Sequence, residues 1–143
     1  MNQRSFEVVL DTSVLVAALR SRRGASFELL RRVGDRGWQL HLSTALLLEY
    51  EAVARREVGK LWLRPELVDA VLDYLCANAR EHAVSFRWRP FLPDPDDDFV
   101  LELAVAAEAE YIVTHNVKDF AGVERFGLTV ITPAQMLLKL TER

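Results

Sequence analysis

The strongest constraint on the fold is the alternation of short apolar runs with segments of helical periodicity. The run Phe6–Leu10 is apolar and rich in β-formers, and it stops abruptly at Asp11. Apolar runs of about four to eight residues are typical of buried strands. The same pattern predicts strands over 6–10, 38–42, 84–88, 111–113 and 128–131, and helices over 14–19, 25–33, 45–58, 66–79, 99–107 and 133–140.

Strands that alternate with helices favour an α/β fold, with a parallel sheet and helices on both faces. Polar residues at the strand ends fit this pattern, since Ser, Thr and Asp are good helix caps. Thr12 or Ser13 is expected to cap the first helix, Ser43-Thr44 the helix after the second strand, and Thr132 the last helix, with Pro133 in its first turn.

Composition narrows the classes of protein that the chain can belong to. Of 143 residues, 50% are hydrophobic and 27% are charged, which is typical of a globular domain and argues against intrinsic disorder. A single cysteine and three scattered histidines argue against disulfides and a Cys/His zinc site. With no signal-like start and no apolar run of about 18 residues, we expect a cytoplasmic protein without a membrane segment.

Acidic and amide side chains gather where the predicted strands end. Asp11 follows the first strand, Glu49 lies early in the helix after the second, and Asn116 and Asp119 follow the strand 111–113. The stretch 94–98 contains four aspartates at the start of another helix. Because active sites of open α/β sheets lie beyond the carboxyl ends of the strands, these side chains are expected to converge.

Each of these residues also has a local structural interpretation. Asp11 can be a helix N-cap, and Asp94 can cap a helix that starts at Pro95, with further acids favoured by the helix dipole. Asn116 and Asp119 are common turn residues. Four mutually repelling aspartates within 94–98 exceed what a helix start requires, so a functional cluster is the stronger interpretation.

Converging carboxylates indicate a hard divalent cation such as Mg²⁺, which binds oxygen ligands and promotes phosphodiester chemistry. The chain has no glycine-rich phosphate loop and no G-x-S-x-G motif. An aspartyl-phosphate enzyme with Asp11 as nucleophile is a further alternative. It is disfavoured because Ser13 stands where phosphatases of the haloacid-dehalogenase type have a second aspartate.

The positions of these acidic residues and of the segments around them resemble the PIN-domain family of metal-dependent ribonucleases, and in particular its toxins of toxin–antitoxin systems. The resemblance implies a single domain over 1–143 with an α/β, PIN-like three-layer fold, in which helices flank a central parallel sheet. The matching segments are Val8 to Leu15, Leu42-Ser43 through Glu49-Tyr50-Glu51, Asp94 to Asp98 leading to Leu103-Ala104, and Tyr111 to Thr114.

The resemblance implies that Asp11, Glu49 and Asp97 are the conserved acids of a metal site, with Asp98 or Asp94 as a supplementary ligand. The sequence departs from the family pattern at Asn116, where many members have aspartate. An amide oxygen can still bind a cation directly or through water, but with one negative charge less. Either Asp119 takes over this role or one ion binds tightly and a second binds only with substrate.

The implied reaction is hydrolysis of RNA phosphodiesters with Mg²⁺ or Mn²⁺ held by Asp11 and Asp97. Glu49 would orient or deprotonate the attacking water, and Thr114 would position the water or a phosphate oxygen. The family also implies an antitoxin protein as partner and a homodimer. A PIN-like binding module without catalysis is the alternative that Asn116 leaves open. The candidate RNA-binding residues are Arg20, Arg22 and Arg23, followed by Arg55, Arg56 and Lys60.

Overall fold

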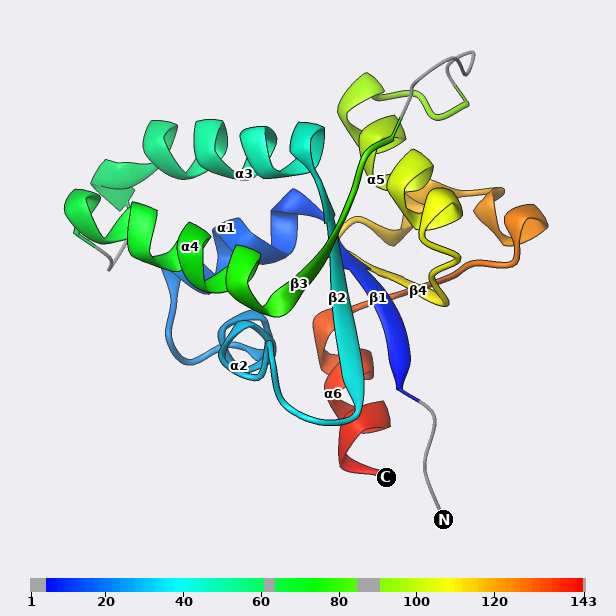
Figure 1. The fold of residues 1–143 in the computed structure, drawn as a ribbon, viewed down its shortest axis with the longest axis horizontal. Helices are drawn as coiled ribbons and strands as arrows, with labels where there is room; N and C mark the ends of the chain where they lie inside the picture. Colours follow the sequence, from blue (N-terminus) through cyan, green and yellow to red (C-terminus); the bar gives the residue numbers. More distant parts are fainter. Residues whose placement is uncertain (1–4, 61–63, 85–90, 143) are drawn as a thin grey trace.

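The computed structural model describes residues 5–60, 64–84 and 91–142, whose strands and helices alternate along the chain (Figure 1). The strands are β1 (Phe6–Leu10), β2 (Trp38–Ser43), β3 (Ala79–His82), β4 (Tyr111–Val113) and β5 (Thr129–Ile131). The helices are α1 (Thr12–Arg20), α2 (Ala25–Arg31), α3 (Thr44–Arg56), α4 (Val68–Asn78), α5 (Pro95–Ala106) and α6 (Pro133–Thr141). Short 3₁₀ turns cover Val58–Lys60, Pro65–Leu67, Val117–Phe120 and Val123–Phe126.

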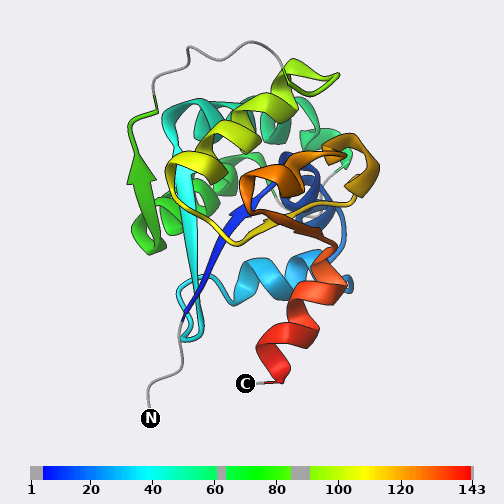
Figure 2. The same cartoon turned by 90° about the vertical axis from the view of Figure 1, so that its right-hand side faces the viewer.

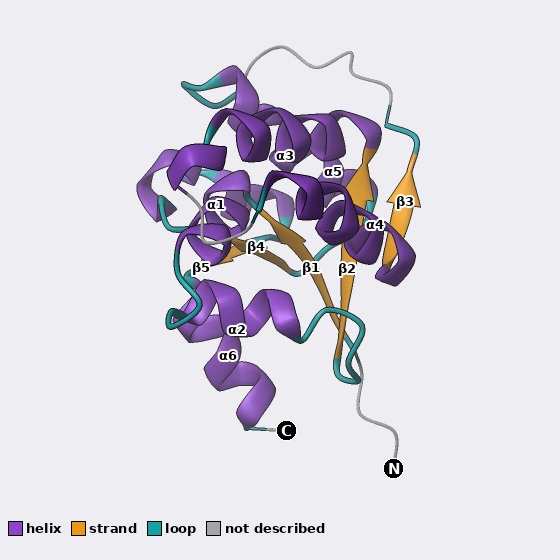
Figure 3. Cartoon of the chain, turned by 90° about the vertical axis from the view of Figure 1, so that its left-hand side faces the viewer, coloured by secondary structure: helices purple, strands orange, loops and turns teal. Residues whose placement is uncertain are grey.

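The described strands form one parallel sheet in the order β3-β2-β1-β4-β5. Helices α1, α3 and α4 cover one face (Figure 3), and α5 covers the other together with the segment 117–126 (Figure 2). This arrangement confirms the expected α/β fold with a central parallel sheet between two helical layers. Within the part of the chain that the structure describes, no helix is long and apolar enough to cross a membrane.

The core lies on both faces of the central strand β1. Val8, Val9 and Leu10 are all at most 2% exposed, as expected for a strand covered by helices on both sides. Tyr50 on α3 is fully buried beneath this strand, and its hydroxyl donates a hydrogen bond to the carbonyl of Leu10. This bond joins α3 to the end of β1, immediately before Asp11.

The edge strand β3 differs from the prediction. A strand was expected over 84–88, but β3 is Ala79–His82, at a position that the sequence pattern assigned in part to the preceding helix. Val84 lies outside any strand, and 85–88 fall outside the described residues. Because β3 is at the sheet edge and consists largely of polar residues, its sequence lacks the apolar run that reveals a buried strand.

Polar side chains join this edge strand to its neighbours. His41 on β2 is 3% exposed, and its Nε2 lies 2.9 Å from a Glu7 oxygen on β1. Its Nδ1 lies 2.7 Å from Nε2 of His82 on β3. Because a carboxylate only accepts, His41 donates to Glu7 through Nε2, and when its ring is neutral its Nδ1 accepts from Nε2 of His82. Burial, His41 and Arg80 lower the pKa of His82, which favours this neutral arrangement.

Several helix starts also differ from the prediction. Helix α5 begins at Pro95 and not at Phe99, because Asp94 caps it by accepting a hydrogen bond from the Asp96 backbone. Helix α1 begins at Thr12 with Asp11 in the N-cap position, so neither Thr12 nor Ser13 is its cap. The cap Ser43 of α3 is confirmed, and so is Thr132, which forms a full capping box with Gln135 of α6.

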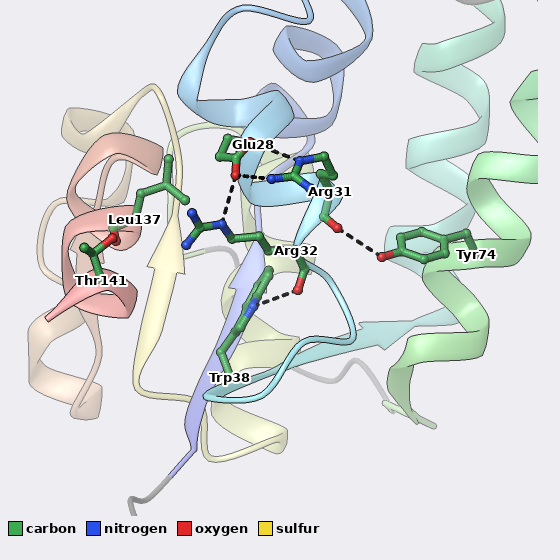
Figure 4. A network of polar contacts seen from close by, with 7 residues as sticks. All are labelled: Glu28, Arg31, Arg32, Trp38, Tyr74, Leu137 and Thr141. Carbon is green, nitrogen blue, oxygen red and sulfur yellow. Dashed lines mark hydrogen bonds and ion pairs between the residues drawn. The ribbon is translucent and has the colours of Figure 1, made fainter. Parts of the chain in front are cut away.

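A polar network fixes α2 against β2 and α4 (Figure 4). Glu28 accepts from the guanidinium groups of Arg31 and Arg32, at 2.6 and 3.0 Å. The carbonyl of Arg32 accepts from the indole nitrogen of Trp38 at 3.1 Å, and the Tyr74 hydroxyl of α4 donates to the carbonyl of Arg31 at 3.4 Å. These contacts hold the turn between α2 and β2 at the end of the sheet opposite the predicted site.

Candidate metal centre

Asp11 is held at the carboxyl end of the central strand. Its backbone N–H donates to the carbonyl of Val113 at 2.9 Å, and the N–H of Thr114 donates to the carbonyl of Ile131 at the same distance. These bonds continue the sheet ladder beyond the strands β1, β4 and β5. Asp11 and Thr114 are therefore brought side by side although 103 positions separate them.

Two hydroxyl groups orient the carboxylate of Asp11, which is 6% exposed. Thr114 Oγ1 and Ser13 Oγ donate to the same oxygen, Oδ2, at 2.7 and 2.8 Å. The side chain makes no capping bond to α1, so the local interpretation of Asp11 as a simple helix cap is not what the structure adopts. Among the residues that the structure describes, none donates a hydrogen bond to its other oxygen, Oδ1.

The loop after β4 is tied to the same hydroxyls. The backbone N–H of His115 donates to Ser13 Oγ at 3.2 Å, and that of Asn116 donates to Thr114 Oγ1 at 3.0 Å. Ser13 therefore links Asp11 to this loop, a role that the sequence analysis did not foresee. Its position two residues after Asp11, in the first turn of α1, is the only signal in the sequence.

Asp97 lies in the first turn of α5 and is half-buried. Burial, followed by the charges of Asp11, Asp94, Asp119 and Asp96, raises its pKa to about 7. Burial and nearby like charges both disfavour the ionised form of a carboxyl group. The structure thus brings Asp97 into the electrostatic range of Asp11.

Glu49 approaches the same region from α3. It is half-buried, and burial together with the charges of Asp96, Asp94 and Asp11 raises its pKa, while Arg56 opposes the change. Helix α3 carries Glu49 here because its N-cap Ser43 directly follows β2. Three elements, β1, α3 and α5, therefore direct acids toward one end of the sheet.

Asp98, also in the first turn of α5, has hydrogen-bond partners of its own. It is 8% exposed, and its Oδ1 accepts from the backbone N–H groups of Phe91 and Leu92 at 3.2 and 3.0 Å. Glu102, one turn further along α5, is equally buried, and burial and Asp98 raise its pKa. The contacts of Asp98 hold the segment before α5 in place.

Asn116 and Asp119 are exposed at the start of the 3₁₀ turn after β4. The Asp119 backbone donates to the carbonyl of Asn116 at 2.9 Å, and the Asn116 side chain makes no capping hydrogen bond to this turn. The charge of Asp119 is among those that raise the pKa of Asp97. Asp119 therefore lies within electrostatic range of Asp97.

The basic candidates differ in their surroundings. Arg20 lines an open groove together with Ser13 and Asn116, and its guanidinium pairs with Glu57. Arg22 and Arg23 are exposed in the turn after α1. Arg55 pairs with Glu51 and Asp69, Arg56 is exposed on α3, and the Lys60 side chain lies outside the described residues.

The donor set suits a hard cation, since it consists of carboxylate, hydroxyl and amide oxygens. Among residues 5–60, 64–84 and 91–142, no three His, Cys, Asp or Glu side chains are close enough to ligate one ion together. Mg²⁺ usually takes only one or two carboxylates and completes its shell with water. Asp11 and Asp97 therefore fit such an ion as its protein ligands.

Solved structures with the same fold come from three bacteria. The VapBC-1 structure from nontypeable Haemophilus influenzae is 17% identical, with a TM-score of 0.61 over 90% of this chain and 99% of that one. VapBC2 from Rickettsia felis, bound to a promoter DNA fragment, is 16% identical, with a TM-score of 0.60 over 89% and 98%. VapC20 from Mycobacterium tuberculosis, a toxin that cleaves the sarcin-ricin loop, is 16% identical, with a TM-score of 0.52 over 85% and 96%.

At these identities the structural likeness establishes the fold. A comparison with curated proteins found no match. The family model described as PIN domain matches residues 7–118, which include β1 with Asp11, Glu49 on α3, Asp97 on α5 and the loop with Asn116. The match spans most of the chain, and so the chain belongs to the PIN domain family.

Proposed function

We propose that this protein is an endoribonuclease that requires Mg²⁺ or Mn²⁺ and hydrolyses RNA phosphodiesters. The observation that carries the proposal is the meeting of carboxylates from separate elements, visible in the pKa of about 7 that burial and neighbouring acids give to Asp97. Such a cluster is costly without a cation and becomes favourable with one. Membership of the PIN domain family supports the same chemistry.

In this proposal Asp11 and Asp97 hold the cation, with Glu49, Asn116 and Asp119 around it. A bound divalent ion would activate water and offset the charge of the phosphate. Glu49 accepts the proton of the attacking water, a task for which its raised pKa suits it. Thr114 and Ser13 keep the Asp11 carboxylate oriented through their hydroxyl groups. Asp98 accepts hydrogen bonds from the backbone before α5 and is not a ligand in this proposal.

We further propose that the enzyme is the toxin of a toxin–antitoxin pair. The support is that the structural neighbours from Haemophilus influenzae and Rickettsia felis are VapBC proteins, and that VapC20 cleaves RNA of the sarcin-ricin loop. An antitoxin protein is then the expected partner in the cell, and a homodimer the expected assembly.

The test is cleavage of a mixed pool of single-stranded and hairpin RNA with Mn²⁺, Mg²⁺ or chelator. Wild type should cleave only with a divalent ion, and Asp97→Asn should lower the rate by about a hundredfold or more. Asp73→Asn, an exposed aspartate on α4, is the matched control and should cleave as wild type does. Cleavage in chelator, or full activity of Asp97→Asn, would contradict the proposal.

The same cleavage experiment, together with thermal unfolding in Mn²⁺, tests the alternative of a binding module without catalysis. In that case, wild type would leave the whole RNA pool intact in Mn²⁺ and would show no Mn²⁺-induced rise of its melting temperature. Restoring the acid with Asn116→Asp would then produce metal binding that wild type lacks, because the substitution adds one carboxylate beside Thr114.

A further inference from the structure

A groove extends from the candidate metal centre along α1. Its volume is about 600 Å³, within the range of small-ligand sites, and it is open to solvent. One end is lined by Ser13 and Asn116, which also contact the Asp11 cluster, and the other end by Arg20. The groove is thus continuous with the site where the scissile phosphate would be held.

The floor of the groove is apolar and built from small side chains. Helix α1 buries Val14, Leu15, Ala18 and Leu19 against the core. Its opposite face presents the half-buried Val16 and Ala17, which line the groove with Val53 of α3. Such a floor offers apolar contact to a nucleobase, and His115 is an aromatic side chain of the same lining on which a base can stack.

His115 forms one wall and is held in place. Its Nε2 lies 2.6 Å from Oγ of Ser26, which is 3% exposed in α2, and its backbone N–H donates to Ser13. The residue itself is exposed and lines the groove. An imidazole ring that is already oriented can stack on a base with little loss of conformational entropy.

Arg20 ends the groove with a positive charge. It is the last residue of α1, and its guanidinium is half-exposed and paired with the largely buried Glu57. This pair restrains the side chain, and the guanidinium has five N–H donors, so several remain for another acceptor. A phosphate oxygen is the acceptor whose charge fits this position.

We propose that this groove seats one unstacked nucleotide of a single-stranded RNA, next to the phosphate that is cleaved. The base lies over Val16 and Ala17 against the ring of His115, and the adjoining backbone phosphate contacts Arg20. The inference rests on the proposed ribonuclease function and specifies its substrate as a strand with at least one base that is free to leave the stack.

The dimensions of α1 agree with this occupant. From Thr12 to Arg20 the helix rises by about 12 Å, at about 1.5 Å per residue. This span is more than three times the rise of about 3.4 Å per nucleotide in a stacked strand. The groove is therefore longer than one nucleotide, so a base that lies on Val16 and Ala17 leaves room for the adjoining backbone to reach Arg20.

The test is binding of a fluorescent, short single-stranded RNA in chelator, measured by anisotropy, so that no cleavage interferes. Ala17→Trp fills the floor and should weaken binding about tenfold, the effect of losing one stacked base. Ala70→Trp, at an exposed alanine of α4, is the matched control and should bind as wild type does. Thermal midpoints confirm that both variants are folded.

A second measurement identifies the nucleotide that occupies the groove. An abasic scan replaces each nucleotide of the RNA in turn by one without a base. At one position this replacement should weaken binding by wild type about tenfold, and it should not change binding by Ala17→Trp. Arg20→Gln should reduce the magnitude of the slope of log affinity against log salt concentration by about one, because one phosphate contact is lost. Ala17→Trp should leave that slope unchanged.

Two results would overturn the inference: equal RNA binding by Ala17→Trp and wild type, or an abasic scan without a sensitive position. A groove used by a peptide partner would give this outcome. Failure of the proposed function is separate, since it appears as absence of Mn²⁺-dependent cleavage by wild type, while binding in chelator still reports on the groove. If wild type cleaves RNA with Mn²⁺ but RNA binding does not depend on the groove, the inference about the groove is wrong and the proposed ribonuclease function stands.

Discussion

At the scale of single residues, Asp97 determines how the protein responds to pH. Its pKa is about 7 in the folded chain, against an ordinary value near 3.8. An acid whose pKa is raised by folding costs stability when it ionises. The fold therefore bears no penalty from this group below about pH 4, and the penalty grows as the pH rises through 7.

The first prediction concerns Asp97→Asn in chelator. Because the amide cannot ionise, this variant should be more stable than wild type at pH 8, by about 1 kcal/mol after solvent screening, and equal to it at pH 4. Thermal unfolding across this pH range is the measurement, with Asp73→Asn as the exposed control. If the thermal midpoint of the variant at pH 8 were lower than that of wild type, the carboxylates would not repel one another at this pH.

At the scale of elements, helix starts position the acidic side chains. Ser43 ends β2 and caps α3 through a hydrogen bond of 3.1 Å from the Leu46 backbone to its Oγ, and α3 carries Glu49 within its second turn. Asp94 does the same for α5, which carries Asp97. The caps thus determine where the chain turns from strand or loop into the helix that bears each acid.

A second prediction follows for Ser43→Ala, which removes the cap of α3. The free energy of unfolding should fall by about 1 kcal/mol, since the buried N–H of Leu46 loses its acceptor. Thr44→Ala changes the next residue, which is exposed and is not the cap, and should alter stability by less than about 0.5 kcal/mol. Chemical denaturation measures both, and an equal loss in the two variants would contradict the role of the cap.

At the scale of the whole molecule, cation binding should link the elements that meet at the sheet end. The acids come from β1, α3, α5 and the loop after β4, so an ion bound there stabilises their mutual arrangement. A ligand that binds only the folded chain adds about 2.7 kcal/mol at a hundred times its dissociation constant.

The third prediction is that Mn²⁺ raises the thermal midpoint more at pH 8 than at pH 6. Proton and cation compete for Asp97, whose pKa of about 7 lies between these two values. Asp11→Asn should abolish most of the effect at both pH values, whereas Asp73→Asn should retain it. A Mn²⁺ effect that is independent of pH would mean that Asp97 does not take part in binding.

Much of the fold was predictable from local patterns. Buried strands such as β1 and β4 are apolar runs, and helices such as α3 and α6 begin at cap residues, because both signals arise from neighbours in the sequence. The edge strand β3 was misplaced, since strands at a sheet edge can be polar and are stabilised by pairing with a distant segment. The start of α5 was predicted correctly only under the alternative that Asp94 is its cap.

The sequence by itself determined which residues can form the site, because acids that follow parallel strands must emerge at one end of the sheet. Only the tertiary structure decided their different surroundings. It placed Thr114 and Ser13 on one oxygen of Asp11, directed Asp98 to the backbone before α5, and opened a groove along α1. These outcomes depend on contacts between segments as far as 103 residues apart, and no local pattern encodes such contacts.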